Sequence, residues 1–142
     1  MTKLDPKGER GLAVIGGMMG EDYAATMRAA AESGKFGSAV TSMALSFAFA
    51  DAWGRPGIEP KSKSMVVIAA LVALRQPSEL KNHVRIGLAN GLTVADFEAI
   101  LIQLTPYVGF PCIASATTAV IEALREAGHD PDVETAEERG LL

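Results

Sequence analysis

The chain has 142 residues and a formal net charge of −4, and 49% of its residues are hydrophobic while 21% are charged. This balance is typical of a folded globular protein and excludes a disordered chain, and the acidic charge argues against a general nucleic-acid-binding protein. The longest apolar run, residues 65–74, is shorter than the roughly 20 residues that span a bilayer, and the charged N-terminus leads us to expect no secretory signal. With a single cysteine, Cys112, the chain fits a reducing compartment, so we expect a cytoplasmic protein and no membrane partner.

The first third of the chain predicts three helices, at about residues 6–19, 22–33 and 36–53. Gly20 and Gly34 are suited to end the first two, because glycine adopts a positive φ at low cost. The third helix has apolar residues on nearly every side, which is typical of a helix that is buried all round or packed against another subunit. Residues 54–60 follow as a turn rich in glycine and proline.

The next two helices are expected to form an antiparallel hairpin. The first runs from about residue 61 to 75 or 76, and its alanines and length favour a helix over a buried strand. The second runs from Pro77, a good first helical residue, to a stop at Gly91. The connection between them is too short for another arrangement.

Two further helices complete the expected fold. Thr93 can cap a helix that reaches about Val108, with Asp96 at its third position, and Pro106 should kink this helix or end its regular part. The last helix covers about residues 112–127. The acidic tail 129–142 is expected to be mobile or to dock on a neighbouring subunit. The sequence thus predicts one all-α domain over residues 1–142, with six or seven helices and a core at about 8–127.

The most distinctive candidate for chemistry is the pair Glu79 and His83, four residues apart on the helix that begins at Pro77. At this spacing both side chains lie on one line of the helix surface, and the carboxylate can orient the imidazole and raise its pKa. The pair is therefore a candidate for proton transfer. The alternative is an ordinary surface ion pair.

A second candidate is the turn at residues 53–57. Trp53 could form an aromatic wall and Arg55 a clamp for a carboxylate, although a tryptophan that only plugs the end of a helix is equally compatible. Cys112 is expected to be a buried structural thiol. No group of His, Cys, Asp and Glu has the spacing of a zinc site, so no metal is expected.

Five segments in register resemble the carboxymuconolactone decarboxylase family, over roughly residues 8–127. They are Trp53-Gly54-Arg55-Pro56-Gly57, Lys63-Ser64-Met65, Glu79-Leu80-Lys81-Asn82-His83-Val84-Arg85, Asn90-Gly91-Leu92-Thr93 and Tyr107-Val108-Gly109-Phe110-Pro111. The broader alkyl hydroperoxidase D-like superfamily carries a CxxC pair before the histidine. In this chain those positions hold Gln76 and Glu79, which argues against peroxidase activity.

The resemblance implies an all-α fold that assembles as a homo-oligomer, either a trimer or a hexamer built as a trimer of dimers. It also implies a cofactor-independent carboxy-lyase of aromatic catabolism (the β-ketoadipate pathway), which converts 4-carboxymuconolactone to the enol-lactone of 3-oxoadipate and CO2. In this interpretation His83 donates a proton and Glu79 orients it, while Arg85 or Arg55 holds a carboxylate and Trp53 walls the ring.

Two positions depart from the family pattern and concern the substrate. Asp51 stands where a glutamate is frequent, and Ala48 where a cysteine is common. The pocket, with Asp51 as part of it, could therefore take a different carboxylate or lactone. A family member with another ring substrate, or a non-catalytic oligomeric protein, is the alternative interpretation.

Overall fold

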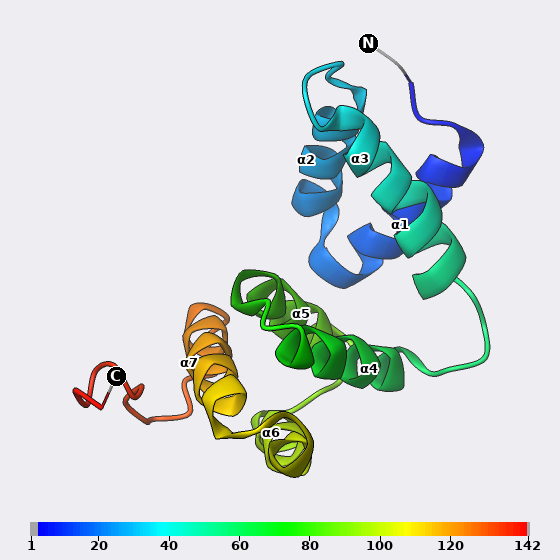
Figure 1. Cartoon of the computed structure of the whole chain (residues 1–142). Helices are drawn as coiled ribbons and strands as arrows, with labels where there is room; N and C mark the ends of the chain where they lie inside the picture. The colour runs from blue at the N-terminus through cyan, green and yellow to red at the C-terminus, as the bar shows by residue number, and fades with distance from the viewer. Residues whose placement is uncertain (1–2, 142) are drawn as a thin grey trace. The chain divides into compact units, whose positions relative to one another are not determined.

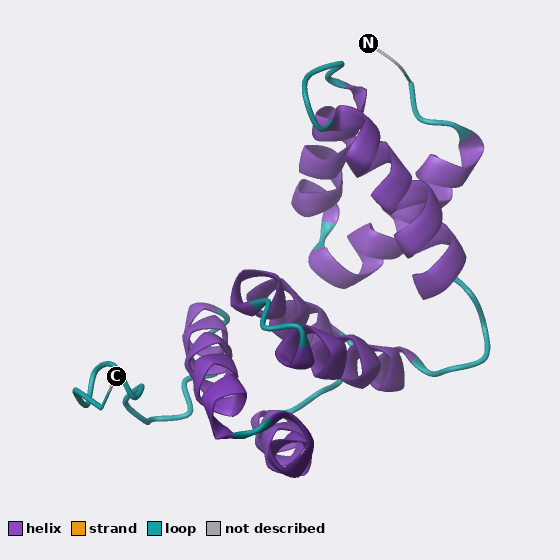
Figure 2. Ribbon diagram, in the orientation of Figure 1, coloured by secondary structure: helices purple, strands orange, loops and turns teal. Residues whose placement is uncertain are grey.

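The computed structural model describes residues 3–141, which are helical with no strand, as the sequence predicts (Figures 1 and 2). The ends of the expected domain and tail, residues 1–2 and 142, lie outside this range. The described chain divides into two compact units, residues 3–59 and 60–141, and each is described here by itself. No helix in the described range has both the length and the apolar character needed to cross a membrane.

The first unit contains three helices, the last of which changes its winding midway. Its elements are α1 (Pro6–Met19), α2 (Glu21–Glu32), α3 (Ser38–Met43) and η1 (Ala44–Trp53), a π-helix that continues α3 directly. Asp5 caps α1 by accepting a 2.7 Å hydrogen bond from the Gly8 N–H. The start and end of α1 agree with the prediction, and α2 is shifted by one residue.

Close backbone packing joins α1 to η1. A Cβ atom added to Gly11 would lie only 2.0 Å from the carbonyl oxygen of Leu45. Glycine at this position therefore allows α1 to approach the main chain of η1. Leu12, Ile15 and Leu45 are buried at this contact.

The expected helix over residues 36–53 differs from the structure in its bounds and winding, and of the two expected environments full burial is wrong, whereas packing against another subunit stays a prediction. The helix begins at Ser38 and becomes a π-helix at Ala44, and it ends where the Gly54 N–H donates to the Phe49 carbonyl five residues earlier, at 2.8 Å. Of its side chains only that of Leu45 is buried. Four large apolar side chains along this segment are exposed, and we call them the exposed stripe: Phe36 before α3, Val40 and Met43 of α3, and Phe47 of η1.

The second unit contains α4 (Pro60–Ala73), α5 (Pro77–Ala89), α6 (Val94–Val108) and α7 (Phe110–Glu126). Its core is a single cluster of buried side chains from all four helices, including Ile68, Val84, Phe97 and Val120. The expected helices match these bounds to within three residues. The Thr93–Asp96 capping box is confirmed, whereas Pro106 does not end its helix, which continues to Val108.

The α4–α5 hairpin is antiparallel, as predicted. Asn90, just after α5, donates a 3.0 Å hydrogen bond to the hydroxyl of Ser64 near the start of α4, so opposite ends of the two helices meet. The turn between them is a Schellman motif: the Gln76 N–H bonds the Leu71 carbonyl and the Arg75 N–H bonds the Val72 carbonyl. Arg75 adopts a left-handed φ of 55° there, a position that usually holds glycine.

The C-terminal segment lies against α7 of its own chain. Arg125 of α7 forms an ion pair with Glu138 at 2.9 Å, and Thr118 donates to Glu137 at 2.7 Å. The tail is thus attached to α7 of its own chain rather than extended away from it, and its docking on a neighbouring subunit stays a prediction.

Candidate functional site

Helix α5 positions the candidate proton-transfer pair. Leu80 and Val84 are buried on its inner face, with exposed fractions of 1% and 0%, and they anchor the helix in the core. Glu79 and His83 each directly precede one of these anchors, so they occupy the neighbouring line of the helix surface. The pattern of the sequence thus predicts the face of α5 on which they lie.

The two side chains differ in their exposure to solvent. The Glu79 Oε1 atom lies 3.8 Å from His83 Nε2, which is ion-pair distance but too long for a direct hydrogen bond. The His83 side chain is only 11% exposed, whereas that of Glu79 is 56% exposed. The geometry is that of a largely buried imidazole with a solvated carboxylate at its edge.

This environment lowers the pKa of His83 below its usual value of 6.5, because burial disfavours the charged imidazolium. Glu79 acts in the opposite direction, but its effect is smaller. The expected effect of Glu79, which favours the imidazolium and raises the pKa of His83, is present but is outweighed by burial, which the sequence did not indicate. At neutral pH the imidazole is mainly neutral.

Arg85 lies about one turn beyond Asn82 on α5 but is already engaged by an acidic side chain. Its Nη2 atom donates to Glu126 of α7 at 2.6 Å, and Asn82 donates to Glu79 Oε2 at 3.4 Å. A substrate carboxylate at Arg85 would have to compete with Glu126. Asn82 is three residues after Glu79, so this spacing could have identified it from the sequence as a partner of Glu79. Nothing in the local sequence pattern indicates that Arg85 is paired with Glu126, which is 41 positions further along the chain.

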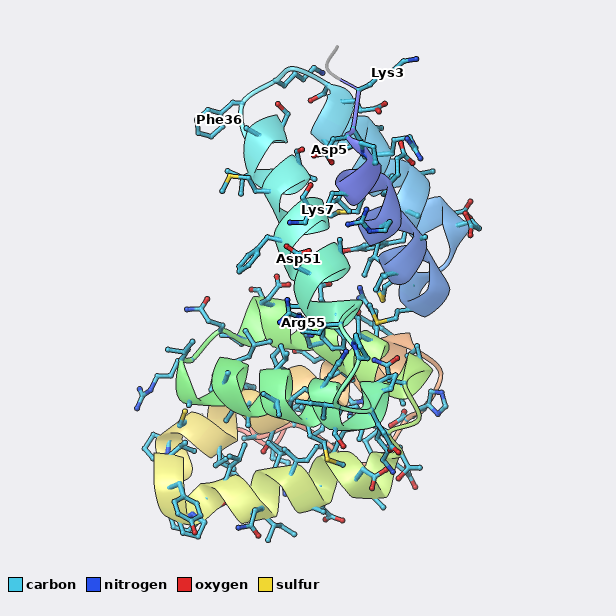
Figure 3. All side chains as sticks on the ribbon, turned by 90° about the vertical axis from the view of Figure 1, so that its right-hand side faces the viewer. Lys3, Asp5, Lys7, Phe36, Asp51 and Arg55 are labelled. Atoms are coloured by element: carbon cyan, nitrogen blue, oxygen red, sulfur yellow. The ribbon has the colours of Figure 1, made fainter. Side chains whose placement is uncertain are left out.

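The other three expected site residues belong to the first unit. Asp51 of η1 forms an ion pair with Lys7 of α1, and Figure 3 shows both side chains. This contact joins η1 to α1 and gives Asp51 a structural role. Trp53 is the last residue of η1 and partly buried, and Arg55 is exposed in the following turn. A substrate-binding role for Asp51, Trp53 or Arg55 stays a prediction.

Neither a metal site nor a reactive thiol is evident in the described chain. Among residues 3–141, no three His, Cys, Asp or Glu side chains are grouped so that they could hold a metal ion. Cys112 is buried, as expected of a structural thiol, and its S–H donates to the Val72 carbonyl at 2.8 Å. Four surface grooves of about 320 to 590 Å³ in this range are lined by residues other than Glu79 and His83.

Comparison with known proteins gives two matches. The model of the carboxymuconolactone decarboxylase family matches residues 39–123, more than half of the chain and inclusive of α5. A 4-carboxymuconolactone decarboxylase from Acinetobacter baylyi is 31% identical over 86 residues, which cover 61% of this chain and 64% of the relative, slightly less than two thirds of its length. The chain therefore belongs to the carboxymuconolactone decarboxylase family.

Proposed function

We propose that the protein is a cofactor-independent carboxy-lyase acting on 4-carboxymuconolactone or a closely similar lactone acid. The observation that carries the proposal is the pairing of Glu79 with the largely buried His83 on α5, inside the region that matches the family. The name of the Acinetobacter relative supports the same reaction.

The proposed reaction needs little more than binding, orientation and one proton. When the carboxylate leaves as CO2, its bonding electron pair delocalises through the ring alkene into the lactone carbonyl, so the substrate supplies its own electron sink. A proton must then add to carbon to give the enol-lactone. The protein's tasks are to hold the carboxylates, to stabilise the developing dienolate and to deliver that proton.

In this proposal His83 delivers the proton and Glu79 orients the imidazole. A lowered pKa in the free protein leaves most His83 neutral near pH 7. A bound substrate adds negative charge beside His83, which favours the imidazolium and raises its pKa in the complex. The proton is therefore taken up as the anionic substrate binds and transferred when CO2 has left.

The experiment is to incubate the purified protein with 4-carboxymuconolactone and measure CO2 release together with the ultraviolet spectrum of the lactone. We expect one CO2 for each enol-lactone formed. Muconolactone, which lacks the extra carboxylate, is the matched control and should release none. Absence of CO2 release from 4-carboxymuconolactone would overturn the assigned substrate and favour a different ring acid or a non-catalytic role.

We also infer that the chain forms a homo-oligomer, a trimer or a hexamer, through the exposed stripe of Phe36, Val40, Met43 and Phe47. These side chains are 69% exposed or more, and large apolar side chains that are exposed together often mark an interface. Val40 and Met43 of α3 and Phe47 of η1 follow one another at three- and four-residue spacing, and Phe36 precedes the helix, so this segment offers a row of apolar side chains to a second copy of the chain.

Light scattering tests this inference at micromolar concentration. Val40→Glu and Phe47→Glu each place a charge on the stripe and should lower the measured mass toward that of one 14.9 kDa chain. Ala30→Glu, on the exposed surface of α2, is the matched control and should leave the mass unchanged. A wild-type protein that is monomeric would exclude the inferred assembly.

A further inference from the structure

The C-terminal segment, residues 129–141, is an ordered clip on α7. The Arg125 guanidinium holds it by pairing with Glu138 and Asp130 and by donating to the Val133 carbonyl. Within the clip, the Thr135 N–H donates to Glu138 at 2.7 Å, and the Glu138 N–H donates to the Thr135 hydroxyl at 3.1 Å. Thr135 is only 3% exposed. Contacts with Arg125 of α7 and hydrogen bonds within the clip together fix the position of this segment.

A pocket of about 380 Å³ lies between this clip, α6 and α7. Its apolar wall includes Leu101 of α6, Ile121 of α7 and Val133 of the clip. The volume falls within the range of about 300–1,000 Å³ that is usual for small-molecule sites, and such sites combine apolar walls with a few polar groups. No residue of α5 lines the pocket, so it is separate from Glu79 and His83.

Two charged side chains in the wall define the chemistry of a ligand. Arg139 is placed by its backbone N–H, which donates to the Thr135 carbonyl at 3.1 Å, and its guanidinium makes no ion pair with a side chain of residues 3–141. A guanidinium is well suited to bind a carboxylate through two parallel hydrogen bonds. Glu98 also lines the pocket and would repel a second carboxylate on the ligand.

We propose that this pocket is a second binding site, which takes a small monocarboxylic acid with an apolar body. The body packs between α6 and α7, and the carboxylate meets Arg139. Because the clip supplies both Arg139 and Val133, the site exists only while Arg125 holds the clip on α7. The proposal does not depend on the reaction proposed for His83.

The test is an NMR titration of the 15N-labelled full chain with 4-phenylbutyrate, with 4-phenylbutan-1-ol as the neutral match. We expect saturable shifts at amides of Leu101, Ile121 and Val133, with a Kd on the order of 1 mM or tighter for the acid, and weaker binding of the alcohol. Shifts centred on α5 would assign the acid to the His83 site and overturn the proposal. Equal affinity for acid and alcohol would also overturn it, because Arg139 would then play no part.

Variants separate the carboxylate contact from the integrity of the clip. Arg139→Gln should weaken 4-phenylbutyrate binding about three- to tenfold and leave the alcohol unaffected, whereas Arg10→Gln, an exposed arginine of the first unit, should change neither. Arg125→Gln should weaken both ligands and raise hydrogen exchange at the Thr135 amide. Unchanged affinity of Arg139→Gln for 4-phenylbutyrate would contradict the proposed site. Unchanged binding of both ligands by Arg125→Gln, in spite of fast hydrogen exchange at the Thr135 amide, would contradict it as well.

Discussion

Glu79 Oε1 lies 3.8 Å from His83 Nε2, yet the pKa of His83 is lowered, because the burial of the imidazole outweighs the nearby carboxylate. The pair therefore does not hold a permanent imidazolium. Burial favours the neutral imidazole at this position, and Glu79 only partly offsets it. This distinction fixes the direction of the pH dependence.

An NMR titration of His83 in a His129→Gln background, which leaves one histidine, measures this pKa directly. We expect a value below 6.5, and a still lower value in Glu79→Gln, because the variant removes the charge that favours the imidazolium. Since the folded protein then binds this proton less readily than the unfolded chain, folding stability should decrease as the pH falls below about 6.5. A His83 that titrates above 6.5 would show that Glu79 dominates over burial.

The contact between Gly11 and Leu45 should be critical for the first unit. In Gly11→Ala the new Cβ would lie 2.0 Å from the Leu45 carbonyl oxygen, so α1 must move away from η1. We expect the free energy of unfolding to fall by about 3 kcal/mol. Urea denaturation measures it.

Gly17→Ala is the matched control in the same helix, since an added Cβ there meets no atom within 4 Å. It should be neutral or stabilise the protein by up to about 1 kcal/mol through helix propensity. Similar losses of stability in both variants would mean that the close approach of α1 to η1 is not what Gly11 provides.

Replacing Arg75 with glycine should stabilise the second unit. This residue has a φ of 55°, in the left-handed region that glycine adopts without a Cβ clash. We expect Arg75→Gly to raise the free energy of unfolding by about 0.5–1 kcal/mol, after part of the gain is lost to the more flexible unfolded chain. The midpoint of thermal or urea unfolding reports the change.

Arg75→Ala distinguishes the backbone effect from loss of the charged side chain. It removes the guanidinium but keeps a Cβ, so it should leave stability close to that of the wild type. Equal stabilisation by alanine and glycine would locate the effect in the side chain instead.

The sequence predicts the bounds of the helices better than it predicts which side chains are exposed, which ion pairs form or how a pKa is shifted. Pro77, Thr93 and Gly20 mark helix ends locally, so the bounds of α5, α6 and α1 follow from short-range rules. The π-helix from Ala44 to Trp53 is not predicted, because this segment is apolar on nearly every side and so has no periodicity that would distinguish i→i+5 from i→i+4 bonding.

The features that depend on long-range contacts could not be derived in the same way. The clip depends on Arg125 meeting Glu138, thirteen positions away, and Arg85 is engaged by Glu126 on another helix. The adjacency of Glu79 and His83 is encoded by their spacing. The sign of the His83 pKa shift is not, because it is set by how completely the fold buries the ring.

Steady-state kinetics on 4-carboxymuconolactone between pH 5 and 9 test the role of His83 most directly, with His129→Ala as the matched control. If His83 donates the proton to carbon, His83→Ala should lower kcat by about 10²–10⁴-fold while His129→Ala does not. In the wild type, kcat/KM should fall as the pH rises through the lowered pKa of the free protein, and kcat should fall at a higher pH, where the bound anion sustains the imidazolium. A His83→Ala variant that turns over the substrate at the wild-type rate would contradict the assignment of His83 as the proton donor.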